Sequence, residues 1–494
     1  MAYRTDREAY TKVIEIFRRQ RKGATIADIS AKSGLSLQKV RELVPRAADE
    51  YSARLEVTES GEILYSFPRG FTSKYRGFRA VLGRFLEKSG KLLKIAGTWF
   101  FKVWIMVMLV GYFVLFMLIA LATLVISVAA ASGSNNSRSS RRHSGGGLFF
   151  TSSIFDLIIR IWFYSELTKS LDGRHYRRNS REAPKGRPLY KAIFSFVFGE
   201  GDPNAGWTEK ENQSVIAYIQ AHQGVISLPE YMTLTGMAPV EAEEGIIAFC
   251  TEFGGSPEVT GDGTIVYRFD ELLRRTDTGN RSFPGLSAPV KRLFSFSSNS
   301  GKMNGWFALI NGVNLGFGGY FLFNALKSGQ ILTQAHLNAA SYLYGVTYLL
   351  FSQIVSNPLP FLIIGLGIVP LVFSLCFWLI PSIRFLGMKK RNEKLKLENL
   401  RKDGYRRIWD NPLSVTDKDI NPQAPECRPR NLSAAREQVI KELGSYAVPD
   451  VAIGDAGTVY VFKELDREKA ALENYRATVD AGASALGKTV FDSE

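Results

Sequence analysis

The pattern of apolar and polar positions along this chain occurs twice, with a shift of 202 residues between the two occurrences. The shift takes Val13 to Val215 and Gly34 to Gly236. The last part of each repeat shares a run of identical residues, which are Glu56, Val57, Thr58, Gly61, Ile63, Tyr65 and Phe67 in the first repeat and Glu258, Val259, Thr260, Gly263, Ile265, Tyr267 and Phe269 in the second. We therefore expect an internal duplication of one small module.

Each repeat begins with helical spacing and predicts three helices. The second helix begins after Thr25 or Ser227, because a hydroxyl group suits the N-cap of a helix. Gly34 and Gly236 follow that helix, where a left-handed residue often ends a helix. The third helix of the first repeat has one apolar face, made of Leu37, Val40, Leu43, Val44 and Ala47.

Proline lies at different places in the two third helices. Pro45 lies inside the helix of the first repeat and should shorten it, because proline removes a backbone hydrogen bond. Pro239 opens the helix of the second repeat, where proline is tolerated.

Strict alternation replaces helical spacing after the third helix. Ile63, Tyr65 and Phe67 alternate with other residues after a turn at Gly61, which predicts a β-hairpin, and the second repeat has the same pattern. A helix, a helix-turn-helix and a hairpin resemble the winged-helix fold, so we assign winged-helix modules to residues 1–70 and 208–273. The expected fold class is α+β winged-helix modules together with α-helical transmembrane segments.

The C-terminal residues carry a shorter version of the pattern. Val439 and Ile440 resemble the apolar pair of the first helix, and Gly457 begins a segment that resembles the second strand of the hairpin. The spacing between these features is shorter than in the two full repeats, so residues 431–494 predict a truncated module without a helix-turn-helix. A helix and a hairpin cannot bury a core alone, so we expect this module to pack on another.

Two long apolar stretches predict membrane regions, which we place at residues 103–167 and 303–383. Residues 103–131 are uncharged and long enough to cross a hydrocarbon core of ~30 Å, which needs about 20 helical residues. In the second region Lys327 is the only charged residue. The best spans of that region are residues 305–326 and 358–380, and residues 339–356 predict either a third span or a re-entrant segment.

The second half of the first membrane region carries two charges. Asp156 and Arg160 lie four residues apart in the apolar residues 148–167, so that they can pair on one helix face. A charge in lipid is costly unless it is partnered, which favours a pair facing the inside of a helix bundle. The alternative is an interfacial helix whose charged groups reach water.

Basic residues flank the membrane regions. Lys and Arg outnumber Asp and Glu by nine to one in residues 68–102, by eight to two in residues 167–191 and by ten to three in residues 384–407. Basic loops stay in the cytoplasm, so we expect the modules on the cytoplasmic side. This placement requires an even number of crossings in each membrane region, so we expect two membrane hairpins. The expected location is a bacterial inner membrane. The expected linkers are residues 71–102, which are typical of an amphipathic helix on an anionic membrane surface, and residues 168–207, 274–302 and 384–430.

The net charge of +15 makes nucleic acid a candidate partner, and the charges on the third helix of each module bear on that candidate. In the first module the exposed face of this helix carries Lys39, Arg41 and Arg46, a candidate surface for nucleic acid or a partner. The second module carries acids instead, which should repel DNA and make a candidate partner surface; they are Glu241, Glu243 and Glu244.

A short motif lies just before the second module. Residues 198–204 have the pattern F-G-x-G-x-P-N, and the region around it resembles an uncharacterised family of cyanobacterial and plastid membrane proteins. The resemblance implies a membrane protein. Plant members carry a label linking them to iron–sulfur cluster biosynthesis, but Cys250, Cys376 and Cys427 are isolated here, whereas a cluster typically needs four thiolates.

One enzymatic pattern occurs in the chain and its context argues against it. Gly482, Gly487, Lys488 and Thr489 fit the phosphate-binding P-loop, but no strand precedes them and too few residues follow for a helix, so a β-strand or a frayed tail is expected. The histidines are scattered and form no metal-ligand pair. We expect no catalysis, no cofactor and no metal site.

Two functions of different class follow from these features. The first is a membrane-bound scaffold or assembly factor whose modules bind a protein partner on the cytoplasmic side, with self-association possible. The second is a membrane-tethered DNA-binding regulator, for which the acidic second module is unfavourable. A transport-related role is a third alternative, limited by the few charges in the membrane regions.

Overall fold

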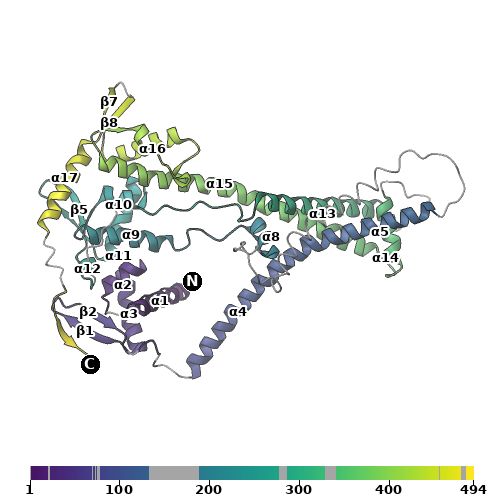
Figure 1. Ribbon diagram of the computed structural model, residues 1–494, viewed down its shortest axis with the longest axis horizontal. Helices are drawn as coiled ribbons and strands as arrows, with labels where there is room; N and C mark the ends of the chain where they lie inside the picture. The colour runs from purple at the N-terminus through teal and green to yellow at the C-terminus, as the bar shows by residue number, and fades with distance from the viewer. Residues whose placement is uncertain are drawn as a thin grey trace, which may run out of the picture. The chain divides into compact units, whose positions relative to one another are not determined.

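The computed structural model describes residues 2–20, 23–68, 70–72, 74, 78–132, 188–276, 286, 288–328, 341–454, 457–479 and 486–493 (Figure 1). These residues are mostly helical, and their strands form small antiparallel sheets of three strands each. The chain divides into two compact units. The first unit comprises Met1–Phe85, Asp202–Phe294 and Lys389–Glu494, and the second unit comprises Leu86–Gly201 and Ser295–Met388.

The first segment of the first unit contains the predicted helices and hairpin. Its elements are α1 (Ala2–Arg19), α2 (Ile26–Ser33), α3 (Leu37–Tyr51), β1 (Arg54–Thr58) and β2 (Ile63–Ser66). Thr25 caps α2 by accepting a hydrogen bond from the Asp28 N–H, and the Asp28 carboxylate accepts one from the Thr25 N–H. Gly34 ends α2 with φ of 70°, which favours glycine.

Pro45 does not shorten α3, so that expectation is wrong. The helix continues from Leu37 through Pro45 to Tyr51 and is as long as its counterpart in the second segment. One hydrogen bond is lost at the proline, but Val44 and Ala47 on either side are fully buried. Packing of the apolar face therefore outweighs the local preference of proline.

The second segment has the same order of elements. It contains α9 (Trp207–Ala221), β3 (Val225–Ser227), α10 (Leu228–Thr235), α11 (Pro239–Phe253), β4 (Ser256–Val259), β5 (Ile265–Arg268) and α12 (Asp270–Leu273). Ser227 and Glu230 form the capping box of α10, and Gly236 ends that helix with φ of 71°. The predicted hairpins are confirmed in both segments, with β1 paired to β2 and β4 paired to β5.

The third segment consists of the end of α15 (Val369–Asp410) and the elements C-terminal to it. These elements are β6 (Val415–Thr416), α16 (Leu432–Gly444), β7 (Asp450–Gly454), β8 (Gly457–Val461), α17 (Lys463–Thr478) and β9 (Thr489–Asp492). The strand order β6-β8-β7 includes a strand from residues that the sequence assigned to a linker. Val439 and Phe462 of this segment share one apolar core with Val215 and Phe253 of the second segment, so the third segment packs on another as expected.

Glycine allows close contact between successive segments. A Cβ atom on Gly34 would lie 2.1 Å from the backbone oxygen of Glu209 in α9, and one on Gly236 would lie 2.6 Å from that of Glu398 in α15. Asn212 also donates a hydrogen bond to the Gly34 oxygen at 3.1 Å. The turn after α2 therefore packs on α9 as the turn after α10 packs on α15.

The second unit contains the long apolar helices. Among the described residues three helices are long and apolar enough to cross a membrane, at Leu92–Ala129, Gly301–Lys327 and Phe361–Asp410. They comprise α4 (Phe78–Met106), the π-helical turn η1 (Val107–Gly111), α5 (Tyr112–Ser132), α13 (Gly301–Ser328), the π-helical segment η4 (Phe361–Ile368) and α15. Residues 148–167, with Asp156 and Arg160, lie outside the described residues.

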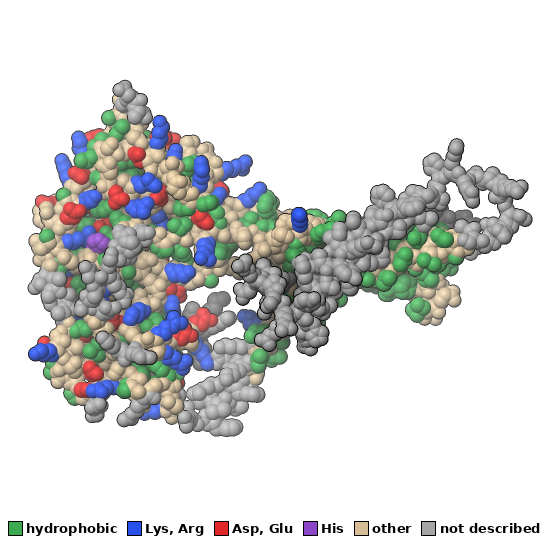
Figure 2. Space-filling model, viewed as in Figure 1, with side chains coloured by type: hydrophobic (Ala, Val, Ile, Leu, Met, Phe, Trp, Pro, Cys, Tyr) green, Lys and Arg blue, Asp and Glu red, His purple; other side chains and the backbone are tan. Residues whose placement is uncertain are grey.

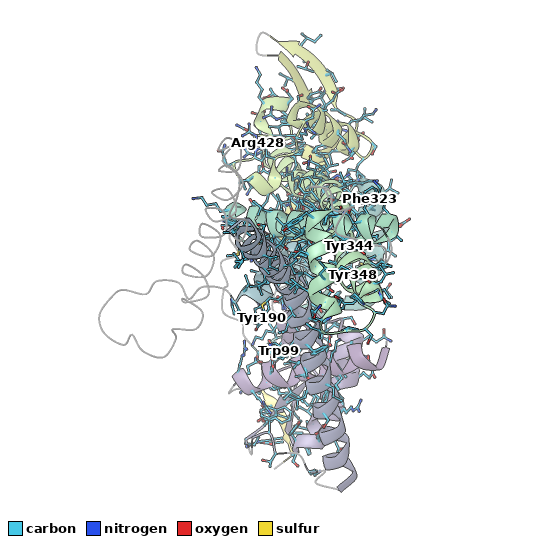
Figure 3. The ribbon with its side chains drawn as sticks, turned by 90° about the vertical axis from the view of Figure 1, so that its right-hand side faces the viewer. Trp99, Tyr190, Phe323, Tyr344, Tyr348 and Arg428 are labelled. Carbon is cyan, nitrogen blue, oxygen red and sulfur yellow. The ribbon has the colours of Figure 1, made fainter. Side chains whose placement is uncertain are left out.

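Two short helices complete the second unit. α14 (Tyr342–Ser352) has 11 residues, about half of what a crossing needs, so residues 339–356 are not a third long span. Its Tyr344 and Tyr348 lie one turn apart (Figure 3), with ring centroids separated by 6.5 Å. α8 (Leu189–Phe198) packs its apolar face on Ile105 and Phe377. On the face shown in Figure 2, charged side chains cover the first unit and apolar side chains cover α14.

Candidate functional site

The basic residues predicted on α3 are engaged within the chain. Lys39 Nζ lies 2.8 Å from a carboxylate oxygen of Asp6 and 2.9 Å from one of Glu42, and these bonds raise the pKa of Lys39. Arg41 Nη2 lies 2.8 Å from Glu271 Oε2 in α12. The Arg46 guanidinium lies over the ring of Tyr10, 5.6 Å from its centroid.

Helix α3 also packs against α11, the third helix of the second segment. The two helices that the sequence compared as DNA-reading elements therefore contact one another, and the start of α3 contributes Leu37 to the core of the second segment. Helix α3 is thus partly covered by the rest of the first unit.

The acidic residues predicted on α11 have a different environment. Glu241, Glu243 and Glu244 are all exposed. Glu241 lines a cleft of 610 Å³, whereas Glu243 and Glu244 do not. Of the three predicted acids, Glu241 alone therefore belongs to the cleft.

The cleft lies entirely within the first unit and brings together two sequence signals. Asp202 and Asn204, from the F-G-x-G-x-P-N motif, line it beside Glu241. Asn204 is held by the backbone of Arg292, with bonds of 2.8 and 2.9 Å, and its own N–H donates to Asp202 at 2.9 Å. The rest of the cleft is lined by Trp207, Gly236, Met237, Lys291, Phe294, Arg391, Lys394, Leu395, Leu397, Glu398 and Arg401.

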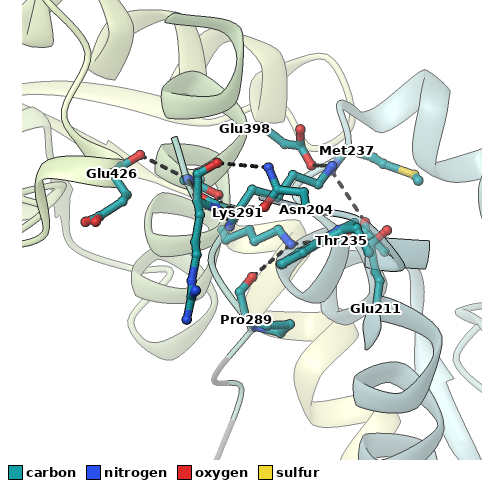
Figure 4. A network of polar contacts seen from close by, with 12 residues as sticks. Asn204, Glu211, Thr235, Met237, Pro289, Lys291, Glu398 and Glu426 are labelled. Carbon is teal, nitrogen blue, oxygen red and sulfur yellow. Dashed lines mark hydrogen bonds and ion pairs between the residues drawn. The ribbon is translucent and has the colours of Figure 1, made fainter. Parts of the chain in front are cut away.

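A buried network of polar contacts supports the cleft (Figure 4). Lys402 of α15 has a side chain only 3% exposed, and its Nζ donates at 3.2 Å to both a carboxylate oxygen of Glu211 and the Pro289 oxygen. The Asn399 side chain bonds to both the N–H and the oxygen of Lys291, while Lys291 forms an ion pair with Glu398. A buried charge is costly unless paired, and these partners supply the pairing.

The cleft offers mixed chemistry. The ring of Trp207 lies near two cations, with Lys402 Nζ at 4.9 Å and Lys291 Nζ at 5.5 Å from its centroid. Arg391 lies over the ring of Phe294 at 4.2 Å, and Lys394 is exposed. Aromatic residues, Met and Arg are enriched at protein interfaces, and the lining of the cleft contains residues of all three kinds.

A second polar cluster joins the second and third segments. Arg476 of α17 forms an ion pair with Glu230 at 2.7 Å, and the two side chains are 14% and 2% exposed. The Tyr218 hydroxyl donates to Glu230 at 2.5 Å. Nearby, burial raises the pKa of Glu468 to about 7, although the hydrogen bond from the Tyr446 hydroxyl acts to lower it. Sequence reasoning missed this cluster, because no local spacing connects residues of α10 and α17.

The second unit contains polar side chains buried among apolar helices. Asn311 and Asn314 of α13 are fully buried. The Asn311 side chain donates to the backbone oxygen of Ser374 at 3.0 Å, and the Asn314 side chain donates to the backbone oxygen of Leu109 in η1 at 2.8 Å. The side-chain oxygens of Asn311, Asn314 and Ser374 have no hydrogen-bond partner among the described residues. Sequence reasoning missed this site as well, although two asparagines three residues apart in an apolar helix are a signal for it.

Cysteine and metal chemistry have little support in the described part of the chain. Burial raises the pKa of both Cys250 and Cys427 to about 11, which makes these thiols poor nucleophiles. Among the described residues no three His, Cys, Asp or Glu side chains are grouped as metal ligands. Thr489 begins strand β9, whereas a P-loop would begin a helix there.

Comparison with known proteins gives one relative. The chain is similar to an uncharacterized chloroplastic protein of Arabidopsis thaliana, with 26% identity over 408 residues that cover 78% of this chain and 70% of the plant protein. No protein-family model matches the chain. No solved structure matches it either.

Proposed function

We propose that this protein is a membrane-anchored interaction scaffold or assembly factor whose winged-helix modules bind one another and a protein partner instead of DNA. The observation that carries the proposal is the engagement of the basic residues of α3. Lys39 and Arg41 contact Asp6, Glu42 and Glu271, and α3 packs against α11. Entry of α3 into a DNA groove would have to break these contacts.

The winged-helix assignment and the duplication belong to the same proposal. Sheets β3-β5-β4 and β6-β8-β7 place their first strand beside their last, and in the first segment Ala24 pairs with Tyr65 of β2 in the same way. The capping boxes at Thr25 and Ser227 are 202 residues apart, as are Gly34 and Gly236. Duplication of one module, together with the contacts that it makes at the glycine turn, accounts for this agreement.

The first unit supports a particular membrane topology. It is one compact unit made of three stretches of chain, separated by the two parts of the apolar second unit. A compact unit lies on one side of a bilayer, so the chain crosses an even number of times between Phe85 and Asp202 and again between Phe294 and Lys389. The basic flanks then favour the cytoplasmic side.

The cleft that contains Asp202, Asn204 and Glu241 is the proposed site for the partner. Two signals that were independent in the sequence, the motif and the acidic third helix, meet there. Its aromatic, Met and Arg side chains favour a folded or extended polypeptide segment over a small anion.

Site-specific photo-crosslinking in native membranes tests this proposal. A photoreactive amino acid at Glu241 should give a crosslinked partner that mass spectrometry identifies. The matched control is the same amino acid at Glu244, an equally exposed acid of α11 that does not line the cleft. Equal crosslinking from both positions, or none from either, contradicts the cleft as the partner site.

A transport-related role has one observation in its favour. The side-chain oxygens of Asn311, Asn314 and Ser374, which have no hydrogen-bond partner in the described part of the chain, lie within apolar helices, where a polar group usually has a function. Liposomes containing the protein should then dissipate a potassium diffusion potential faster than liposomes containing the Asn311→Leu, Asn314→Leu variant. Equal rates of dissipation would mean that the two asparagines only form hydrogen bonds between helices.

A further inference from the structure

Strand β9 adds a third strand to the hairpin of the first segment. It pairs antiparallel with the outer edge of β1, which gives the strand order β2-β1-β9. The Leu55 oxygen accepts a bond from the Ser493 N–H at 3.0 Å, and the Leu55 N–H donates to Ser493 Oγ at 2.9 Å. The Glu59 N–H donates to the Lys488 oxygen at 2.9 Å.

Backbone bonds and one ion pair hold this strand. Arg54 Nε donates to Asp492 at 2.8 Å, and the second guanidinium nitrogen contacts the other carboxylate oxygen of Asp492. The side chains of Val490 and Phe491 remain 68% and 59% exposed. The strand therefore adds little apolar contact, and any extended peptide with a carboxylate in the place of Asp492 can make the same bonds.

The second segment lacks this acceptor edge. The residue that corresponds to Leu55, 202 positions later, is Pro257 of the outer strand β4. Proline has no N–H to donate, and it is one of the residues that protect the edge of a sheet from added strands. The repeats therefore differ at the backbone N–H that donates to Ser493 Oγ, which the first repeat keeps at Leu55 and the second lacks at Pro257.

We propose that the outer edge of β1 is a docking site for an extended peptide of a partner protein, and that β9 occupies it as an internal competitor. Arg54 selects a carboxylate side chain in the peptide, and the Leu55 backbone fixes its register. This site is separate from the cleft, and it does not depend on what the cleft binds.

Peptide binding to the full-length protein in detergent tests the proposal. The probe is a fluorescent peptide with the sequence of residues 487–493, followed by anisotropy. The Phe491→Pro variant removes a backbone N–H from β9, so the internal strand should leave and the peptide should bind about tenfold or more tightly than to the wild type, where the tethered strand competes at high effective concentration. Adding Leu55→Pro or Arg54→Ala to that variant should abolish the gain.

Two controls make the result decisive. Val490→Ala changes only an exposed side chain and should bind the peptide as weakly as the wild type does. A Val57→Cys, Phe491→Cys variant, oxidised to a disulfide, should bind no peptide and run as a monomer on a denaturing gel. Equal binding by the wild type and Phe491→Pro, when both keep the same circular dichroism, would overturn the proposal. A disulfide-linked dimer would overturn it as well, because β9 would then come from a second copy.

Discussion

Arg41 and Glu271 lie 2.8 Å apart, although they come from different segments of the chain. Arg41 is one of the three basic residues of α3 that the sequence placed on a DNA-facing surface, and Glu271 lies in the short helix α12 after the second hairpin. The contact is half-exposed, so its contribution to stability is small. The ion pair matters more for binding, because the Glu271 carboxylate neutralises a cation that would otherwise be available to DNA phosphates.

The engagement of these cations predicts weak DNA binding. The full-length protein in detergent should show no sequence-selective binding to duplex DNA near ~0.15 M salt, because few phosphate contacts remain to be made. Fluorescence anisotropy over a salt series measures this, and Lys39→Glu with Arg41→Glu should change nothing at that salt. Tight, selective binding that these substitutions abolish would instead support a membrane-tethered regulator.

Gly34 and Gly236 should be sensitive to substitution by alanine. Both have positive φ, which costs alanine about 1–2 kcal/mol, and a Cβ at either position would also collide with a backbone oxygen of a helix in the following segment. Gly61→Ala is the matched control, since Gly61 also has positive φ but a Cβ atom there would meet nothing within 4 Å. Thermal unfolding of the full-length protein should show a clearly larger loss for Gly34→Ala and Gly236→Ala than for Gly61→Ala. Equal losses would show that the glycine contacts between segments are absent.

The tyrosines of the two hairpins should differ in their effect on stability. Tyr65 is 5% exposed in the core of the first segment, so Tyr65→Ala should lower the free energy of unfolding by ~3 kcal/mol. Tyr267 is only partly buried and should cost less. Ile63→Ala, at a position 37% exposed, serves as a control with little effect. Denaturant unfolding followed by circular dichroism measures the three variants, and a loss for Ile63→Ala as large as that for Tyr65→Ala would mean that Ile63 is buried as deeply as Tyr65.

Glu468 should make stability depend on pH. Burial raises the pKa of Glu468 to about 7, whereas a carboxyl group in the unfolded chain titrates near ~4.3. The folded protein therefore binds more protons between these values, so this contribution to stability is complete below ~4.3 and is lost as the pH rises through about 7. Glu468→Gln should unfold at a higher temperature than the wild type at pH 8 and should flatten the dependence between pH 6 and 8. Glu464→Gln, an exposed acid on the same helix, should leave that dependence unchanged.

The topology predicts that both hairpins lie on the same side of the membrane. Single cysteines at Ser60 and Asp262 should both resist an impermeant thiol reagent in intact cells and both react after the membrane is opened, because both positions belong to the first unit. Labelling of one position alone in intact cells would require an odd number of crossings between them. The native cysteines do not obscure this test if they are first replaced by serine.

Local features of the fold could be predicted from the sequence. The Thr25 cap, Gly34 and the alternation around Tyr65 each act within a few residues, so local pattern alone identified the N-cap, the turn and the hairpin, although it did not identify Asp28 as the partner of Thr25. The expectation for Pro45 was wrong for the opposite reason, because the burial of Val44 depends on packing against other elements of the first segment, such as Val13 of α1 and Tyr65 of β2.

The candidate site could be predicted only in fragments. Glu241 and the motif residues Asp202 and Asn204 each stand out in the sequence, but nothing local shows that they line one cleft. Lys402 gave no signal, since a lysine in a basic linker has no feature that reveals its ion pair with Glu211. A β-strand was one of the two expectations for the C-terminal tail, but the pairing of β9 with β1 was hidden, because four exposed residues carry no apolar pattern that points to β1.

The position of β9 has a consequence for how the protein is made. Its Asp492 lies 438 residues after its partner Arg54. At about 5–20 residues per second, a ribosome reaches β9 roughly 20–90 s after it has made β1. Throughout that interval the edge of β1 is an open template to which other newly made chains can add. The first sheet is therefore completed only after both membrane regions have been synthesised, so the earliest part of the chain to fold is among the last to be finished.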